Sequence, residues 1–199
     1  MFKEFKVCGA EALLTYSEKD KILFSQDLFS QHIATKDRVS RGINSAEKGL
    51  ISYFVNYLLP FDKMPDITGY GIDILAPNHG ALFKNDVRNV LKLYENLVSG
   101  KSKNKVTVLY SSIWRGNEKM AYAIADGIAF TGTEVETINY EKCDIGDILP
   151  KLFESNAIVF GSPSFKGGVT PDLLKILYSI EKIGLKNKEI GLFSCYSGS

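Results

Sequence analysis

The stretch KVTVLYSSIWRGNEKMAYAIADGIAFTG, residues 105–132, decides the fold class. It opens with a continuous apolar and β-branched run at 106–110, which is typical of a strand buried on both faces of a sheet. A short polar loop, SSIWRGN, follows the run, and an Ala-rich helix then ends at Gly132, a C-cap signal. The stretch therefore predicts one strand–loop–helix unit of an α/β protein.

The same alternation continues toward the C-terminus. The sequence predicts further strands at 134–140 and 157–161 and one beginning at Glu189, with helices around Pro150 and at 171–183. Strands that alternate with helices require a parallel sheet with right-handed crossovers. The C-terminal half is thus expected to be a doubly wound parallel sheet.

The N-terminal half is less regular. The turn SEKD, residues 17–20, separates two apolar runs and predicts a hairpin. A mostly buried helix is expected at 46–61, ended by Pro60, and an apolar strand at 71–80 runs into a polar loop. The polar, basic segment VSGKSKNK then follows a helix at 87–98 and indicates a boundary. We therefore predict one domain at 1–100, a linker at 101–104 and a second domain at 105–199.

Composition excludes several classes of partner. The formal net charge of +1 supplies no electrostatic field for holding nucleic acid or an anionic membrane. No apolar run approaches the roughly 20 residues of a membrane span, and the first residues lack the apolar core of a secretory signal. The widely spaced Cys8, Cys143 and Cys195 argue against a disulfide framework and a zinc site. We expect a cytoplasmic protein.

Three loops are expected to meet at one edge of the parallel sheet, because ligands of such sheets bind beyond the carboxyl ends of the strands. The first, at 111–117, has the hydroxyl and glycine content of an anion site at a helix N-terminus. The other two follow at 161–171 and 194–199, and each loop carries an aromatic residue. The candidate cofactor-binding residues are Ser111, Ser112, Ile113, Trp114, Gly116, Asn117, Ser162, Pro163, Ser164, Phe165, Gly167, Gly168 and Tyr196.

A phosphate loop beside three aromatic side chains suits a flat ring system with a phosphate tail, and flavin mononucleotide (FMN) fits this description. A simpler alternative stays open for each loop taken alone. A Ser- and Gly-containing loop before a helix is often an ordinary turn. Trp114, Phe165 and Tyr196, each taken singly, are more typical of packing residues than of stacking partners.

The chain also resembles a known protein family. The motifs NKVTVLYSS, EKMAYAIADGI and AIVFGSPSFKGG are similar to the flavodoxin-like domain of the A-type flavoproteins, also called flavodiiron proteins. DKILFSQDLFSQHIAT, NYLLPF and DILAPNHG resemble the metallo-β-lactamase-like domain that precedes it in this family. The resemblance implies a partial metallo-β-lactamase-like αβ domain followed by a flavodoxin-like doubly wound parallel sheet that lacks its last strand and helices.

The resemblance also implies a function. The family reduces oxygen or nitric oxide at a non-haem diiron centre, with electrons delivered through FMN from a rubredoxin-like donor, and it forms head-to-tail homodimers. By position, Asp27 matches the family's bridging carboxylate and His79 a histidine ligand, both suitable for iron. Judged without the resemblance, Asp27 is a turn or N-cap residue and His79 a loop histidine.

The chain departs from the family pattern in both halves. The family's HxExD-type ligand cluster has no counterpart here, and Cys8 stands where the family has a further histidine. Arg115 occupies a position where glycine is expected, so it either contacts phosphate or crowds the turn. The expectation is an incomplete flavodiiron-type oxidoreductase, with activity left open. The alternatives are a flavodoxin-like FMN electron carrier without diiron chemistry, or a non-catalytic remnant.

Overall fold

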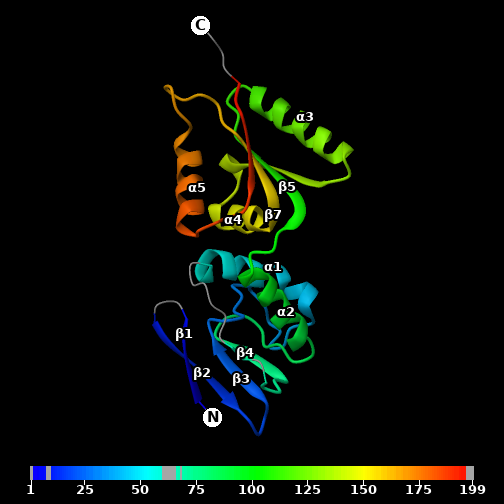
Figure 1. The fold of residues 1–199 in the computed structure, drawn as a ribbon, viewed down its shortest axis with the longest axis vertical. Helices are drawn as coiled ribbons and strands as arrows, with labels where there is room; N and C mark the ends of the chain where they lie inside the picture. The colour runs from blue at the N-terminus through cyan, green and yellow to red at the C-terminus, as the bar shows by residue number, and fades with distance from the viewer. Residues whose placement is uncertain (1, 8–9, 60–65, 68, 196–199) are drawn as a thin grey trace. The chain divides into compact units, whose positions relative to one another are not determined.

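The computed structural model describes residues 2–7, 10–59, 66–67 and 69–195. The chain divides into two compact units, Met1–Lys101 and Ser102–Ser199. Each unit contains its own four-stranded sheet and its own helices (Figure 1). The fold is therefore α/β, with one mixed and one fully parallel sheet.

The first unit is built on the mixed sheet. Its strands are β1 (Phe2–Val7), β2 (Ala10–Ser17), β3 (Ile22–Gln26) and β4 (Ile74–Pro77), in that order across the sheet. The pairs β1–β2 and β2–β3 are antiparallel, whereas β3 and β4 are parallel. The β2–β3 hairpin confirms the turn predicted at SEKD. Strand β1 is not predicted by the sequence.

The helices of the first unit are amphipathic or largely buried. They are α1 (Ile43–Tyr53), the π-helical η1 (Phe54–Leu58) that continues it, and α2 (Val87–Val98). The Asp86 carboxylate accepts a hydrogen bond from Ile43 N at 2.7 Å, which ties the start of α1 to the start of α2. The helix predicted at 87–98 is confirmed, and the expected stop of the earlier helix at Pro60 lies outside the described residues.

The second unit contains the parallel sheet that the opening stretch predicts. Its strands are β5 (Lys103–Tyr110), β6 (Glu134–Asn139), β7 (Ser155–Gly161) and β8 (Glu189–Phe193), in the order β6-β5-β7-β8. All three pairings are parallel. Strand β5 begins at Lys103, inside the segment expected to be a linker, and is longer than the predicted apolar run.

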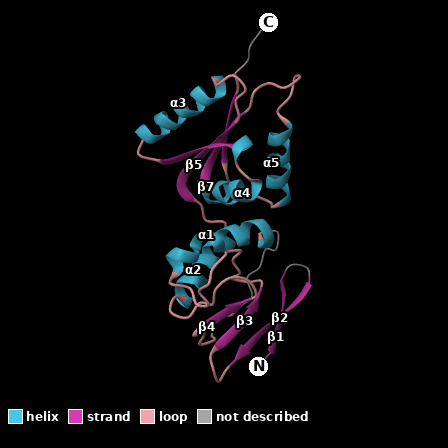
Figure 2. Ribbon diagram, turned by 180° about the vertical axis from the view of Figure 1, so that it is seen from behind, coloured by secondary structure: helices cyan, strands magenta, loops and turns pink. Residues whose placement is uncertain are grey.

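Helices cover both faces of this sheet. They are α3 (Gly116–Phe130), the 3₁₀ turn η2 (Tyr140–Lys142), α4 (Ile145–Glu154) and α5 (Pro171–Lys182). Figure 2 shows α3 on one side and α4 with α5 on the other. Alternation along β5 divides its side chains accordingly: Val108 packs with the α3 core and Leu109 with the opposite core.

The strand order fixes where a ligand can bind. From β5 the chain crosses to β6 on one side, then returns to β7 and β8 on the other. The direction of winding therefore reverses between β5 and β7, and loops at such a switch point leave a crevice at the carboxyl ends of the strands. The loops at 111–115 and 162–170 leave the sheet at this point.

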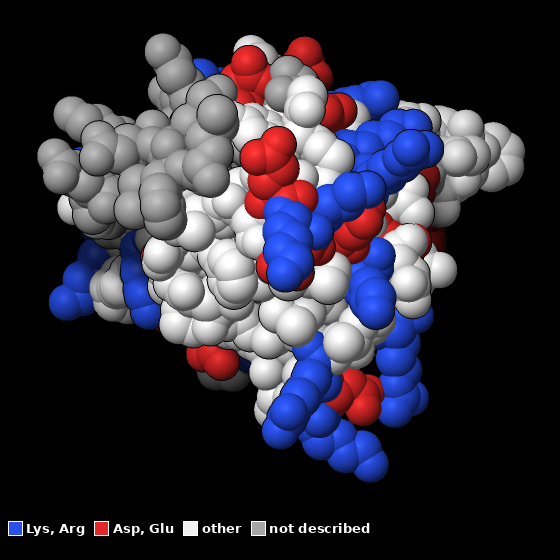
Figure 3. All heavy atoms as spheres, turned by 90° about the horizontal axis from the view of Figure 1, so that it is seen from below, with Lys and Arg blue, Asp and Glu red and all other residues white. Residues whose placement is uncertain are grey.

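Surface charge is mixed on the face shown in Figure 3, where basic and acidic side chains are interspersed. This agrees with the formal net charge of +1. Across the part of the chain that the structure describes, the helices are too short or too polar to cross a bilayer.

Lys188 holds several segments together at the amino-terminal edge of the parallel sheet, the edge opposite the carboxyl ends of the strands. Its ammonium group donates hydrogen bonds to the backbone oxygens of Phe153 and Ser155, each at 2.6 Å, and to Ser102 Oγ at 2.7 Å. Burial lowers the pKa of Lys188 to about 8. The residue therefore links the start of β7 to the segments before β5 and β8.

We predict that replacing this side chain changes stability in a pH-dependent way. In the unfolded chain lysine has a pKa of about 10.4, so between about pH 8 and 10 the unfolded state binds more protons than the folded state. The free energy of unfolding of the wild type, relative to Lys188→Met, should therefore rise with pH across this range. Urea unfolding of both proteins near pH 7.5 and 9.5 measures this difference. The exposed Lys186→Met is the control, and a difference that falls with pH would contradict the assignment.

Candidate functional site

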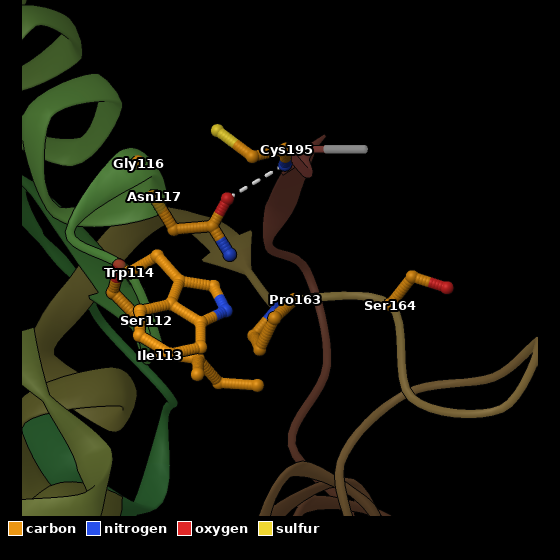
Figure 4. Close-up of a pocket in the computed structure, with 8 residues that line it drawn as sticks. All are labelled: Ser112, Ile113, Trp114, Gly116, Asn117, Pro163, Ser164 and Cys195. Carbon is orange, nitrogen blue, oxygen red and sulfur yellow. Dashed lines mark hydrogen bonds between the residues drawn. The ribbon is translucent and has the colours of Figure 1, made fainter. Parts of the chain in front are cut away.

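A pocket of about 320 Å³ lies at the carboxyl ends of the parallel strands (Figure 4). It is lined by Ser112, Ile113, Trp114, Gly116, Asn117, Pro163, Ser164 and Cys195. Seven of these eight are candidates from the sequence, and Cys195 is the addition. Among the other candidates, Ser111, Ser162, Phe165, Gly167 and Gly168 are not lining residues, and Tyr196 lies outside the described residues.

The start of α3 forms one wall of this pocket. The helix begins at Gly116, and its first backbone N–H groups have no acceptor within the helix. A helix N-terminus carries a partial positive charge of about half an elementary unit, which favours an anion. None of the eight lining side chains carries a formal charge, so this end of α3 is the main electrostatic feature of the wall.

Gly116 lies in close contact with Cys195, just beyond the end of β8. A Cβ atom at this position would lie 2.9 Å from Cys195 Sγ. The Cys195 thiol in turn lies 3.1 Å from Met120 Sδ on α3. The sequence places Cys195 in the third loop, but only the fold shows that its side chain reaches the first.

Asn117 joins the first and third loops. Its side chain is almost fully buried, at 2% exposure. Its Oδ1 accepts a hydrogen bond from Cys195 N at 2.7 Å, and its Nδ2 donates to Ser111 O at 3.2 Å. Both ends of the amide are thus engaged with protein, so Asn117 shapes the pocket wall by holding two loops together.

Buried hydroxyl groups join the first and second loops in the protein interior, next to the pocket. Ser111 Oγ donates to Tyr140 Oη at 2.8 Å, and Tyr140 Oη lies 2.8 Å from Thr170 Oγ1. Thr170 N then donates to Ser162 Oγ at 3.4 Å. Ser111 and Ser162 therefore support the pocket from behind. Sequence reasoning missed Tyr140 and Thr170, which carry no local signal of this contact.

The second loop contains a tight turn. Phe165 and Gly168 exchange backbone hydrogen bonds, both at 2.9 Å. Between them Lys166 and Gly167 have φ values of 47° and 80°, as in the two-residue turns that join paired strands. Phe165 is half-exposed in this turn and is not among the residues that line the pocket.

Trp114 is an aromatic side chain left in solvent at the pocket. It is 89% exposed, and the adjacent Ile113 is 55% exposed. Figure 4 shows the indole ring among the lining residues, with Pro163 nearby and the Ser164 hydroxyl pointing away from the others. An exposed indole beside a crevice offers a face on which a flat ring can stack.

Arg115, between two lining residues, is held away from the pocket. Its Nε donates to Glu118 Oε2 at 2.7 Å on the first turn of α3. This hydrogen bond raises the pKa of the Arg115 guanidinium further above its already high value. Arg115 therefore carries its charge at all physiological pH values.

In the first unit, the structure brings the two metal candidates together. Asp27 follows β3 and His79 follows β4, so parallel pairing of these strands places both residues beyond adjacent strand ends. His79 Nε2 lies 3.7 Å from Asp27 Oδ1, and both side chains are about half exposed. Asn78 Nδ2 donates to the same carboxylate oxygen at 3.4 Å.

Aromatic rings surround His32, which lies beside His79. The His32 ring lies 5.1 Å from that of His79, and the rings of Tyr53 and Tyr57 lie 4.8 and 5.0 Å from His32. Within the described ranges, no group of three or more His, Cys, Asp or Glu side chains is arranged to hold a metal. Non-haem iron sites use at least three protein ligands, so these residues alone do not fit a diiron centre.

Comparison with known proteins identifies relatives along almost the whole chain. No family model matches. A nitric oxide reductase from Moorella thermoacetica is 29% identical over 198 residues, covering 94% of this chain and 49% of the relative. A rubredoxin-oxygen oxidoreductase from Megalodesulfovibrio gigas is 26% identical over 200 residues, covering 95% and 50%. The chain spans about half the length of the curated relatives it matches.

Solved structures agree with the sequence relatives. The flavodiiron protein from Giardia intestinalis superposes with a TM-score of 0.87 at 27% identity, covering 92% of this chain and 47% of that one. The rubredoxin oxygen:oxidoreductase from Desulfovibrio gigas gives a TM-score of 0.90 at 24% identity, covering 97% and 51%. These matches define the class: an α/β fold shared with flavodiiron proteins over half their length. The chain is similar to flavodiiron proteins along almost its whole length, as the sequence motifs predict.

We predict that Tyr140→Phe destabilises the second unit by about 1–3 kcal/mol, because it leaves the buried hydroxyl groups of Ser111 and Thr170 without their shared partner. Chemical unfolding of the full chain measures the change. Tyr178→Phe removes a hydroxyl from an exposed tyrosine of α5 and is the matched control. Equal effects of the two substitutions would show that the buried contacts contribute nothing to stability.

Proposed function

We propose that the second unit is a flavodoxin-like domain that binds FMN in the pocket and transfers electrons as part of a flavodiiron-type oxidoreductase. The observation that carries the proposal is the position of the pocket, at the switch point between β5 and β7 and beside the start of α3. The strand order β6-β5-β7-β8 corresponds to the first four positions of the flavodoxin order 2-1-3-4-5.

The residues present suit this cofactor. The N-terminus of α3 favours a phosphate group, and the uncharged lining accommodates a largely apolar ring system. The exposed Trp114 supplies a stacking surface. When bound, the flavin would supply one- and two-electron transfer.

The protein's own part is to shape and hold the site. Asn117 keeps the first and third loops together, and the Ser111–Tyr140–Thr170 contacts keep the first and second together. Trp114 and Pro163 orient the ring and exclude water from it. Preorganised loops reduce the entropy lost when a ligand binds.

The first unit is proposed to be part of a metallo-β-lactamase-like domain. The family resemblance makes Asp27 and His79 candidate iron ligands, but two ligands do not complete a diiron site. Reduction of oxygen or nitric oxide would therefore need ligands beyond those of the described residues. The names of the relatives support these two acceptors and a rubredoxin-like electron donor. The head-to-tail homodimer rests on the family resemblance.

A second candidate function is an FMN electron carrier without diiron chemistry. It is favoured by the short ligand set: within the described ranges, Asp27 and His79 are joined by no third ligand in a metal-holding group. Iron content distinguishes the two candidates. The diiron function requires two iron atoms per chain after anaerobic loading with Fe(II), whereas the carrier function requires none. A chain that folds and holds neither iron nor flavin would be a non-catalytic remnant.

We predict that FMN quenches the fluorescence of Trp114, which is the single tryptophan of the chain and lines the pocket. Titrating the full chain with FMN, with excitation selective for tryptophan, should give saturable quenching, because a flavin stacked nearby accepts the excitation energy. Loss of the flavin's own fluorescence should follow the same binding curve. Unchanged Trp114 emission with a folded chain would refute binding at this pocket.

Substitution of Trp114 tests whether its ring contributes to FMN binding by stacking, rather than through loss of any exposed aromatic side chain. Trp114→Ala should weaken FMN binding by about tenfold, since stacking of a ring on an aromatic side chain contributes about 1–3 kcal/mol. Phe130→Ala removes another exposed aromatic residue, 95% exposed at the far end of α3, and is the control. Flavin fluorescence measures both variants, and equal losses of affinity would place the ring elsewhere.

A further inference from the structure

Arg115 has a backbone conformation that disfavours side chains. It is the residue before α3 and has φ 63° and ψ 1°, in the left-handed region that suits glycine. A non-glycine residue at such a position calls for a local explanation. Burial does not explain it, because the side chain is 80% exposed. Because packing does not account for the left-handed conformation, the function of the exposed side chain is the remaining explanation.

The Arg115 guanidinium is held only weakly. Its bond to Glu118 engages Nε, one of five N–H donors of the group. Exposed ion pairs of this kind contribute little to stability. Trp114 and Gly116, on either side of Arg115, line the pocket, while Arg115 itself is turned toward Glu118. A cation thus lies beside the pocket, retained by a bond that is easily exchanged.

Among the described residues that line the pocket, none supplies a positively charged side chain. Its eight lining side chains are neutral, and Arg115 is the only charged residue of the loop at 111–117. The amide of Asn117 and the hydroxyl of Ser111 are engaged with protein. A helix N-terminus supplies about half a positive charge, whereas a phosphate monoester carries about 1.5 to 2 negative charges near neutral pH. The helix N-terminus therefore balances only part of the phosphate charge, and one cation at the start of α3 would balance most of the remainder.

We propose that Arg115 is the residue that selects the phosphorylated form of the flavin, by exchanging the Glu118 carboxylate for the phosphate monoester. Glu118 then competes with the ligand and sets how tightly the pocket holds it. Guanidinium and phosphate form charge-assisted, often bidentate hydrogen bonds, which an exposed Arg–Glu contact through Nε alone does not match. Riboflavin has the same ring without the phosphate and gains nothing from the exchange. This inference rests on the proposed FMN function.

The test compares FMN and riboflavin binding to the full chain by flavin fluorescence. Arg115→Gly should lose about tenfold or more in FMN affinity and keep its riboflavin affinity. Its melting temperature should rise, because glycine accommodates the left-handed conformation. Glu118→Gln should tighten FMN binding severalfold. Lys119→Gln removes a neighbouring exposed charge from α3 and should leave the ratio of the two affinities nearly unchanged.

The outcomes separate this inference from the proposed function. Equal FMN-to-riboflavin ratios in the wild type and Arg115→Gly would overturn the role of Arg115 and leave FMN binding standing. Failure of the folded wild type to bind either flavin would overturn both. Competition by inorganic phosphate, present in the wild type and lost in Arg115→Gly, would support phosphate as the recognised group. Arg115→Asn, which also tolerates the left-handed region, provides a second neutral variant.

Discussion

The Tyr140 hydroxyl is the contact on which the architecture of the pocket depends. It bonds Ser111 at the end of β5 and Thr170 at the start of α5, residues that lie 29 and 30 positions away in sequence. Without a shared polar partner, each of these buried hydroxyl groups would be left unsatisfied. The tyrosine therefore fixes the separation of the two loops that leave the sheet at its switch point, and a ligand pocket forms between them.

Close contacts of glycine complete this arrangement. At Gly161 a Cβ atom would lie 2.1 Å from Phe193 Cζ, and at Gly116 it would meet Cys195 Sγ at 2.9 Å. These approaches bring the end of β8 and the residues after it against the end of β7 and the start of α3. The pocket thus has three walls from parts of the chain far apart in sequence, each held by packing or hydrogen bonds rather than by the ligand. Under the proposed function, the positive charge for binding the phosphate comes from the backbone dipoles at the start of α3 and from Arg115.

The sequence predicts the parallel sheet well because its signal is local. The apolar run at 106–110 and the glycine at the end of α3 are read within one strand and one helix. Seven of the eight lining residues are also among the candidates from the sequence, since loops after parallel strands meet at one edge. Tyr140, Thr170 and the Cys195 contact escape prediction, because they arise only when distant segments pack together. The left-handed backbone of Arg115 likewise requires the folded chain.

The most direct test of the account is hydrogen–deuterium exchange of the full chain with and without saturating FMN. We predict slower exchange of backbone amides at 112–117 and 162–168, where the loops form the pocket, and unchanged exchange in β3 and the segment that carries Asp27. Protection confined to the first unit, or no protection of either loop under conditions where FMN is bound, would contradict it.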